Sequence, residues 1–243
     1  MRIAYLFQSI GIDFAESGAP QVHMHHIVRG LHRAGHSICL LSLRGRRAVL
    51  WTGDDLDSIW QQGASKDHIA KLGVSGSPWF RFLESGVRRV QSSLNLPYLA
   101  VSDTYRMFDA SVNNLSGYEL IHERFNSLAL GGTLASRRLD VPLVLEVNAD
   151  PFEEQAFQGL SKSWLYEQFA IRATCLACQR ASAVICVSDQ LKKHLIKRWL
   201  VDPGKITVLP NAADVNSFGK EYDNEALKDS LGLSTAPVVM FVG

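Results

Sequence analysis

The sequence predicts an α/β fold: a doubly wound, Rossmann-like parallel sheet with helices on both faces. Three observations lead to this prediction. Short apolar runs alternate with amphipathic helical segments along most of the 243 residues, which is typical of parallel α/β domains. Runs such as Val141–Val147 are apolar on both sides, as strands buried in a parallel sheet are. The hydrophobic content of 47% and the charged content of 20% are those of an ordinary globular protein.

The first βαβ unit is predicted at the N-terminus. Met1–Phe7 is a short apolar strand, and a helix follows over Gln21–Ala34 after a loop. Gly35 ends this helix as a C-cap residue, and Ser37–Leu43 forms the second, parallel strand. The side chains expected on the buried face of the helix are Val22, His25 or His26, Ile27, Val28 and Leu31.

The stretch Arg44–Gly117 is less regular. Arg44-Gly-Arg-Arg47 is interpreted as a basic, solvated turn, and helices are expected over Trp79–Leu94 and Ala100–Asn114. Four aromatic side chains form either a platform for a sugar or lipid or part of the core, namely Trp51, Trp60, Trp79 and Phe80. We see no clear amphipathic basic helix, and Val87–Val90 is the nearest approach to one.

Regular alternation resumes after Gly117. Strands are predicted over Tyr118–His122, Pro142–Val147, Ala183–Val187 and Lys205–Leu209, with helices over Leu128–Leu139, Glu153–Arg180 and Gln190–Trp199. Ser188 is placed to cap the last of these helices. A polar segment, a short helix over Asn224–Leu231 and a strand over Pro237–Val242 follow.

We expect three parts in the chain. Residues 1–211 form the first domain, and residues 212–236 form an interdomain linker. Residues 237–243 are interpreted as the first strand of a second Rossmann-like domain, because an apolar run closed by glycine is how such a unit begins. The chain is therefore expected to be the front part of a two-domain protein.

Composition excludes several classes of function. A net charge of +1 provides no general attraction for nucleic acid. Every apolar run falls far below the roughly 18 residues that span a bilayer, and the N-terminus lacks the pattern of a signal peptide. The four cysteines are interpreted as reduced core thiols, with a redox or metal role for Cys175 and Cys178 as the alternative.

The candidate ligand-binding residues come from the carboxyl ends of the predicted strands, where such sheets bind ligands. Gly18 precedes the first helix, where a glycine and a helix N-terminus admit an anion; a plain turn is the alternative. His23 lies close to the start of that helix and suits polar binding. It shares a face with His26, but no acidic residue completes a metal site.

Two later strand ends carry further polar groups. His122-Glu123-Arg124 follows the strand that begins at Tyr118 and suits hydroxyl recognition, with a structural Glu–Arg ion pair as the alternative. Alternation points Glu146 and Asn148 to the same side, where a carboxylate and an amide bind sugar hydroxyls or shape a catalytic site. The remaining candidates at strand ends are Asp150, Ser188 and Asn211.

Together these stretches resemble the N-terminal domain of family 4 retaining glycosyltransferases, which have the two-Rossmann-domain GT-B architecture. Gly18, His23, Leu31, Gly35 and His36 match the family pattern, while Ala19 replaces a glycine. The segment "ASAVICVSDQLKKHLIKRWLVDPGKITVLPNAAD" is the strongest match, with Ala212 where glycine is usual. The segments "IHERFN" and "VPLVLEVNADP" resemble a subgroup of the family.

The resemblance implies a cytoplasmic transferase of glycan biosynthesis. Such enzymes move a sugar from a nucleotide-sugar donor to a carbohydrate or lipid-linked acceptor, with retention of configuration, and some work at the inner membrane face. No cofactor and no essential metal are implied. By position, Gly18 would approach the donor phosphates, and Asn148 stands where many members place a histidine near the anomeric carbon. An amide cannot act as a general base, so Asn148 is expected to hydrogen-bond the transferred sugar.

The function predicted is therefore the acceptor-binding half of a retaining glycosyltransferase, inactive alone and dependent on a C-terminal donor-binding domain in cis or in trans. The catalytic candidates are Asn148 and Glu146, and the substrate-binding candidates are Gly18, His23, His122, Glu123, Arg124, Asp150, Ser188 and Asn211. The alternative is a naturally short binding or regulatory module that pairs with a separately encoded donor-binding subunit. An NAD-type dehydrogenase is disfavoured, because the dinucleotide fingerprint and its ribose-binding acid are missing.

Overall fold

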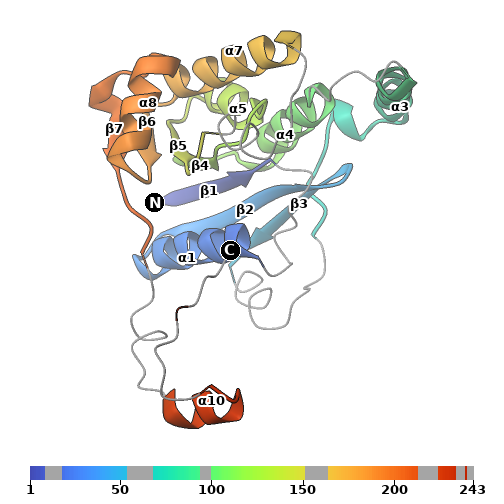
Figure 1. Cartoon of the computed structure of the whole chain (residues 1–243). Coiled ribbons are helices and arrows are strands. Elements are labelled where there is room, and N and C mark those ends of the chain that lie inside the picture. Colours follow the sequence, from blue (N-terminus) through green and yellow to red (C-terminus); the bar gives the residue numbers. More distant parts are fainter. Residues whose placement is uncertain are drawn as a thin grey trace. The chain divides into compact units, whose positions relative to one another are not determined.

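The computed structural model describes residues 1–8, 18–53, 68–93, 100–150, 164–212, 224–233 and 239. The chain divides into two compact units, Met1–Pro210 and Asn211–Gly243. In the first unit, seven strands of the described chain form one sheet in the order β3-β2-β1-β4-β5-β6-β7 (Figure 1). The strands are β1 (Arg2–Phe7), β2 (Ser37–Arg44), β3 (Arg47–Thr52), β4 (Leu120–Arg124), β5 (Leu143–Val147), β6 (Ala183–Cys186) and β7 (Ile206–Val208).

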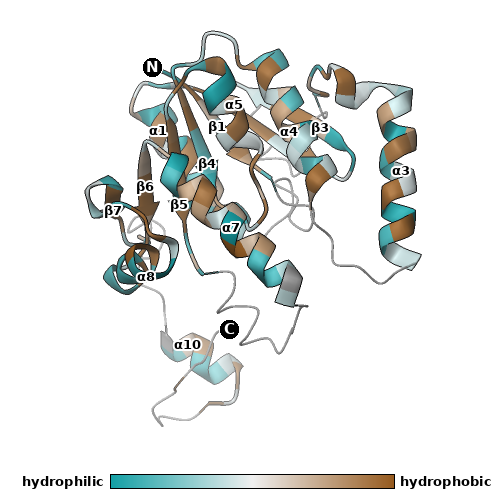
Figure 2. Cartoon of the chain, turned by 90° about the horizontal axis from the view of Figure 1, so that it is seen from above, coloured by the Kyte–Doolittle hydropathy of each residue, from teal (hydrophilic) through white to brown (hydrophobic). Residues whose placement is uncertain are grey.

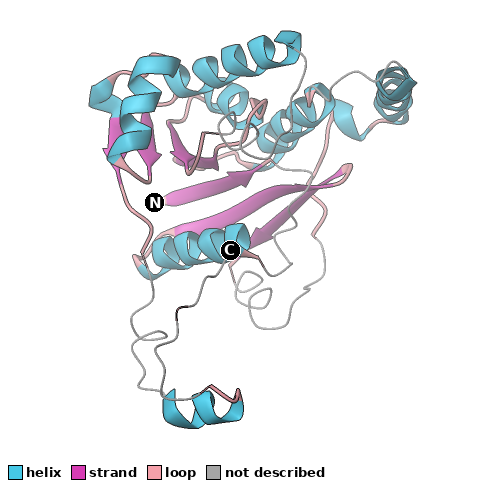
Figure 3. Cartoon of the chain, in the orientation of Figure 1, coloured by secondary structure: helices cyan, strands magenta, loops and turns pink. Residues whose placement is uncertain are grey.

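Helices cover both faces of this sheet, and the predicted fold class is confirmed. One face is covered by α1 (Ala19–Arg33). The other is covered by α4 (Val101–Asn114), α5 (Gly131–Leu139), α7 (Trp164–Arg180) and α8 (Asp189–Trp199) (Figures 1 and 3). A further helix, α3 (Pro78–Ser93), follows the short 3-10 helix η1 (Val74–Gly76) and is joined to α4 by ion pairs. A second 3-10 helix, η2 (Pro203–Lys205), precedes β7.

The edge strand β3 is antiparallel to β2, so the sheet is mixed, and the loop expected after Arg44 is a hairpin. Arg44 pairs with Arg47 across a turn of two residues. Gly45, the first of the two, has φ +58°, which a two-residue hairpin requires and which glycine adopts without strain. The basic turn was visible in the sequence, but the strand that follows it was missed.

Alternation along the strands divides the core into two layers. In β1, Tyr5 and Phe7 pack toward α1, while Ala4 and Leu6 pack toward the opposite helices. Figure 2 shows apolar residues along much of β5 and β6. Trp51 lies in the layer beneath α1, so it belongs to the core and not to a surface platform. Trp60 lies outside the described residues.

Helix α1 begins two residues earlier than predicted and buries a different stripe. Gln21, Met24 and Val28 are its buried residues, whereas Val22, expected in the core, is 51% exposed. The buried side chains follow the i, i+3, i+7 spacing of one helix face. The end of the helix agrees with the prediction, because Gly35 follows the C-cap residue with φ +85°.

The cysteines are free thiols, as the sequence indicated. Cys39, Cys178 and Cys186 are buried and Cys175 is half-buried. Burial raises the pKa of the Cys39 and Cys178 thiols to about 12, so these two remain protonated at neutral pH. Among the described helices, none combines the length and the apolarity that crossing a bilayer requires.

The second unit contributes one described helix, α10 (Asn224–Ser230), which matches the predicted short helix. Apart from Val239, the strand predicted over residues 237–242 lies outside the described residues. The assignment of that segment to a second Rossmann-like domain stays a prediction, as do the boundaries of the predicted linker.

Candidate functional site

The candidate site lies where the strand order of the sheet reverses. β1 stands between β2 and β4 and is parallel to both, so the chain runs outward from β1 in two directions. In open α/β sheets, ligands bind beyond the carboxyl ends of the strands at such a switch point. The side chains at the carboxyl ends of β1, β4 and β5 are therefore the first candidates for ligand binding.

Glu146 is the centre of the polar groups at this edge. Its carboxylate accepts hydrogen bonds from the Tyr5 hydroxyl at 3.2 Å and from His122 Nε2 at 3.1 Å. It also accepts from His23 Nε2 at 2.6 Å and from Asn148 Nδ2 at 2.7 Å. We call these five residues the Glu146 cluster. A carboxylate can only accept when it is ionised, so both histidines carry a proton on Nε2.

The sheet register explains why these residues meet. Tyr5 of β1 pairs with His122 of β4, and His122 pairs with Val144 of β5. Because side chains alternate, Glu146 projects from the same face as Val144 and reaches His122 and Tyr5. The rings of Tyr5 and His122 lie 5.0 Å apart. His23 comes from the second turn of α1, the helix that covers this face.

The cluster holds a buried negative charge. Burial by itself would raise the pKa of Glu146, but hydrogen bonds from His122, His23 and Asn148 outweigh it and hold that pKa well below its usual range. Burial and the Glu146 charge both raise the pKa of the Tyr5 hydroxyl well above its ordinary value. The result is an ionised carboxylate that fixes two imidazoles and an amide, of which His23 is the more exposed imidazole.

Two polar atoms, one in the Glu146 cluster and one on a neighbouring strand, have no hydrogen-bond partner among the described residues. They are Asn148 Oδ1 and Arg124 Nη1, and both are buried. Arg124 pairs in register with Glu146, so its side chain projects from the same face of the sheet. Buried polar atoms in proteins are nearly always bonded. An acceptor and a cationic donor at one edge suit a ligand that carries hydroxyl or phosphate groups.

The N-terminus of α1 adds a favourable environment for an anion. Its N-cap is Gly18, and no acidic residue lies in the first turn. The backbone of Gly18 is extended (φ −176°), which any residue adopts, so glycine is not needed for its conformation. A Cβ there would lie 2.5 Å from Oε1 of the Gln21 side chain. The predicted contact of Gly18 with donor phosphates stays a prediction.

The prediction that His122, Glu123 and Arg124 follow the strand was wrong, because β4 extends through Arg124. Alternation therefore separates Glu123 from its neighbours and places it on the opposite face, fully buried against α5. Glu123 accepts one hydrogen bond, from Gly132 N at 3.3 Å, and burial raises its pKa to about 8. The structure thus brings His122 and Arg124 to the site but not Glu123, and adjacent residues on opposite faces form no ion pair.

Asp150 and Ser188 contact α8. Asp150 is buried, lies 2.9 Å from His194 Nε2 and forms an ion pair with Arg198 at 3.4 Å. Ser188 caps α8 by accepting a hydrogen bond from Leu191 N at 3.1 Å. Both contacts have a structural purpose, and a substrate contact of either residue stays a prediction. Asn211 belongs to the second unit, and its role stays a prediction as well.

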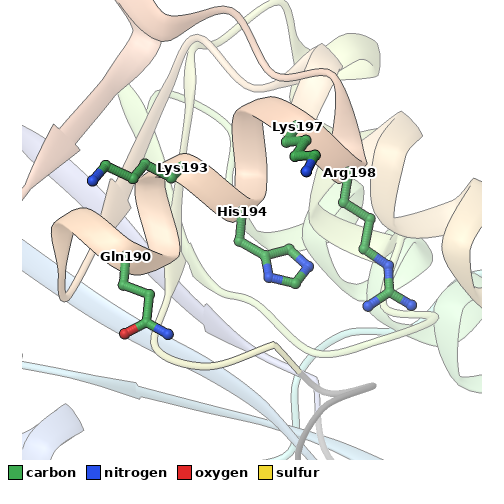
Figure 4. Close-up of a pocket in the computed structure, with 5 residues that line it drawn as sticks. All are labelled: Gln190, Lys193, His194, Lys197 and Arg198. Atoms are coloured by element: carbon green, nitrogen blue, oxygen red, sulfur yellow. The ribbon is translucent and has the colours of Figure 1, made fainter.

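A pocket of about 530 Å³ runs along α8. Figure 4 shows that Gln190, His194 and Arg198 project from the same side of this helix. The pocket is lined by Gln190, Lys193, His194, Lys197 and Arg198. Its three lysine and arginine side chains make it suited to an anionic group.

The sequence pointed to four of the five cluster residues but missed Tyr5. A tyrosine in an apolar N-terminal strand reads as core, and only the register with β4 shows that its hydroxyl reaches Glu146. Within the described part of the chain, no group of three or more His, Cys, Asp and Glu side chains is placed to hold a metal ion. His23 bonds Glu146, and His26, its partner in the metal alternative, is exposed.

Known proteins resemble this chain in sequence and in fold. It is 30% identical over 117 residues to the Escherichia coli UDP-Gal:alpha-D-GlcNAc-diphosphoundecaprenol alpha-1,3-galactosyltransferase, an alignment that covers 47% of this chain and 28% of the relative. The fold matches Anabaena HepE in complex with UDP-glucose (TM-score 0.54, 19% identity), covering 96% of this chain and 50% of that one. It also matches the sucrose-phosphate synthase of Thermosynechococcus elongatus (TM-score 0.50, 13% identity), covering 95% and 53%.

The chain thus spans about half the length of the solved structures it matches. The sequence profile of Glycosyltransferase Family 4 matches residues 20–217, which is most of the chain and includes every residue of the Glu146 cluster except Tyr5. This match confirms the resemblance drawn from the sequence motifs. The chain belongs to Glycosyltransferase Family 4.

Proposed function

We propose that this chain is the acceptor-binding half of a retaining glycosyltransferase that uses a nucleotide-sugar donor. The observation that carries the proposal is the Glu146 cluster at the switch point of the sheet, with Asn148 Oδ1 and Arg124 Nη1 unpartnered among the described residues beside it. Family membership supports glycosyl transfer. The sites for the nucleotide would come from a C-terminal domain, in cis or in trans.

In this proposal the cluster positions the reacting sugar. Asn148 Oδ1 accepts from a hydroxyl group, while Glu146 fixes the amide through Asn148 Nδ2. His23, held by the same carboxylate, presents its ring beside the N-terminal half of α1. The departing diphosphate is stabilised by the positive end of α1 and by cations of the donor-binding domain. Asn148 and Glu146 thus position the sugar, and neither acts as a general base in the reaction.

We further propose a UDP-sugar donor and an acceptor linked to a lipid diphosphate. HepE was solved with UDP-glucose, and the name of the E. coli relative gives UDP-Gal and a diphosphoundecaprenol-linked acceptor. The cationic pocket along α8 supports an acceptor that carries phosphate groups. An acceptor of this kind would place the enzyme in the cytoplasm, at the inner face of the membrane.

The test uses the complete enzyme, in which this domain is joined to its donor-binding domain, with the substitution Glu146→Gln. We expect kcat/KM for the acceptor to fall by about 100-fold, because the neutral amide no longer holds His23 and Asn148 in place. In this proposal the C-terminal domain holds the nucleotide and therefore most of the donor, so the KM for the donor should change much less than kcat/KM for the acceptor. Steady-state kinetics with each substrate varied in turn measures both quantities.

Glu119→Gln is the matched control. Glu119 is exposed just before β4, at the amino ends of the strands and therefore away from the candidate site. There it accepts a hydrogen bond from Arg2 N. This variant should retain full activity. An equal loss in both folded variants, or a loss confined to the donor KM, would contradict the acceptor-side assignment.

Retention of configuration and independence from metal complete the proposal. Product formed from an α-linked UDP-sugar should show an α-anomeric proton by NMR, and EDTA should leave the rate unchanged. A β-anomeric product would overturn the retaining assignment, and loss of activity in EDTA would overturn the metal-independent one.

A further inference from the structure

Helix α3 presents an apolar face that the rest of the described chain leaves exposed. Trp79 is 66% exposed and Phe82 is 71% exposed, and their rings stack with centroids 6.0 Å apart. We define the α3 apolar face as Trp79, Phe82, Leu83, Val87 and Val90, all of them exposed. Helix α3 stands at the edge of the unit, away from the sheet (Figures 1 and 2). We propose that this face docks the domain on a bilayer that contains anionic lipid.

The helix is held to the domain by a different, mostly polar side. Glu84 is buried and binds Arg106 of α4 at 2.6 Å, and Arg88 binds Glu84 at 2.9 Å. Phe80 packs against Tyr105, with ring centroids 5.4 Å apart. These contacts anchor α3 to α4 through residues other than the five exposed apolar side chains. Those side chains remain available to an external apolar phase.

The charges around α3 identify a lipid surface as the partner. Arg81 and Arg89 are exposed, whereas Glu84, the helix's one acidic residue, is buried between arginines. The basic β2–β3 turn adds Arg46, which donates a hydrogen bond to Ser85 Oγ at 3.1 Å. A helix with aromatic residues on one face and arginines on the other is the pattern of helices that lie in the interface of an anionic membrane.

A second copy of the chain fits this surface less well than a membrane. In a two-fold symmetric dimer the same patch meets itself, so the arginines of one copy (Arg81, Arg89 and Arg46) would face the arginines of the other. Anionic headgroups instead complement these charges, while Trp79 and Phe82 enter the acyl boundary. This inference rests on the proposed function, which places the enzyme at the inner face of the membrane. It adds the surface of the domain that contacts the lipid.

Vesicle flotation tests the inference without donor or acceptor, so its result is independent of sugar transfer. The full chain should bind vesicles of phosphatidylcholine with about 30% phosphatidylglycerol at least ~10-fold more tightly than pure phosphatidylcholine vesicles. Trp79→Ala/Phe82→Ala should lower binding to the anionic vesicles by about 10-fold. Arg81→Glu/Arg89→Glu should lower it by a similar factor of about 10 and leave binding to neutral vesicles unchanged.

Two controls separate this surface from general adhesion. Arg33→Glu/Arg138→Glu changes net charge equally at exposed positions of α1 and α5, and Val22→Ala removes an exposed apolar side chain from α1. Both should bind as the wild type does, with circular dichroism confirming the fold of every variant. No binding by the wild type, undiminished binding by the α3 variants, or equal losses in the controls would overturn the inference. So would self-association in light scattering that Trp79→Ala/Phe82→Ala abolishes, without vesicle binding.

Discussion

At the scale of single residues, two buried glutamates on neighbouring strands show how surroundings decide charge. Glu146 receives hydrogen bonds from four side chains, and its pKa is held low. Glu123 receives one, from a backbone amide, and burial raises its pKa to about 8. Burial raises the pKa of both carboxyls, so the number of hydrogen-bond donors decides which carboxyl is ionised at neutral pH.

Glu123 predicts a loss of stability with rising pH. The carboxyl takes up protons in the folded state below its pKa of about 8, while in the unfolded chain it ionises near 4.5. The free energy of unfolding should therefore fall as pH rises from about 4.5 to about 8. Glu123→Gln should remove this slope and stabilise the protein at pH 8, on the order of 4 kcal/mol, since one pKa unit corresponds to about 1.4 kcal/mol.

Urea unfolding of both proteins between pH 5 and pH 8.5, which covers most of the window of roughly 4.5 to 8, measures this slope. Glu167→Gln, at an exposed position of α7, serves as the control and should leave the slope unchanged. Parallel pH profiles for the wild type and Glu123→Gln would show that the carboxyl does not carry a raised pKa.

At the scale of elements, α3 is a helix that the sequence predicted but whose amphipathic character the sequence did not make clear. A helix usually turns its apolar stripe toward the core and its charges toward solvent. In α3 the buried side carries Glu84 and Arg88, neutralised by Asp103 and Arg106 of α4. From the sequence, Trp79 could belong either to the core or to a surface platform, and Val87–Val90 was only the nearest approach to an amphipathic basic helix. The contacts with α4 show that the polar side of α3 is the buried one, which leaves Trp79 exposed.

Helix α8 illustrates a local signal that the structure confirms. Ser188 was expected to cap it, and its Oγ accepts from Leu191 N. Ser188→Ala should lower the free energy of unfolding by about 1 kcal/mol, because a backbone amide of the first turn loses its partner. Urea denaturation at pH 7 measures the difference.

Ser188→Asp preserves an acceptor at the cap and should restore most of the loss. Ser92→Ala, on an exposed position of α3, should change stability by less than about 0.5 kcal/mol. A Ser188→Ala protein as stable as the wild type would show that the cap contributes nothing measurable.

At the scale of the whole molecule, the proposed function makes nucleotide binding depend on a second domain. At a UDP concentration about 100 times Kd, the complete enzyme should gain about 2.7 kcal/mol, seen as a rise of several degrees in Tm. The 243-residue chain alone should show no rise and no sugar transfer. Thermal shift with UDP, paired with a transfer assay, measures both. Robust transfer by this chain alone would contradict the proposed division of labour.

Much of the fold follows from local signals that act within a few residues. The strand runs, the glycine after α1 and the cap of α8 mark elements wherever they lie in space, because backbone sterics and capping hydrogen bonds are local. The limits of the elements were less well determined. β4 ends two residues later than predicted, so Glu123 lies within the strand and its side chain points to the face opposite the site. The antiparallel direction of β3 depends on a short turn whose pairing the sequence shows only weakly.

The sequence by itself determined the mostly parallel α/β architecture, the membership of Glycosyltransferase Family 4 and the strand ends where polar groups gather. Only the tertiary structure decided which of those groups meet. Tyr5 and Glu146 are 141 residues apart in the chain, and His23 and Glu146 are 123 apart. Their contacts exist because strand order and register bring β1, β4 and β5 together beneath α1. The physical reason is that register is set by the packing of whole strands, a property that no single segment carries.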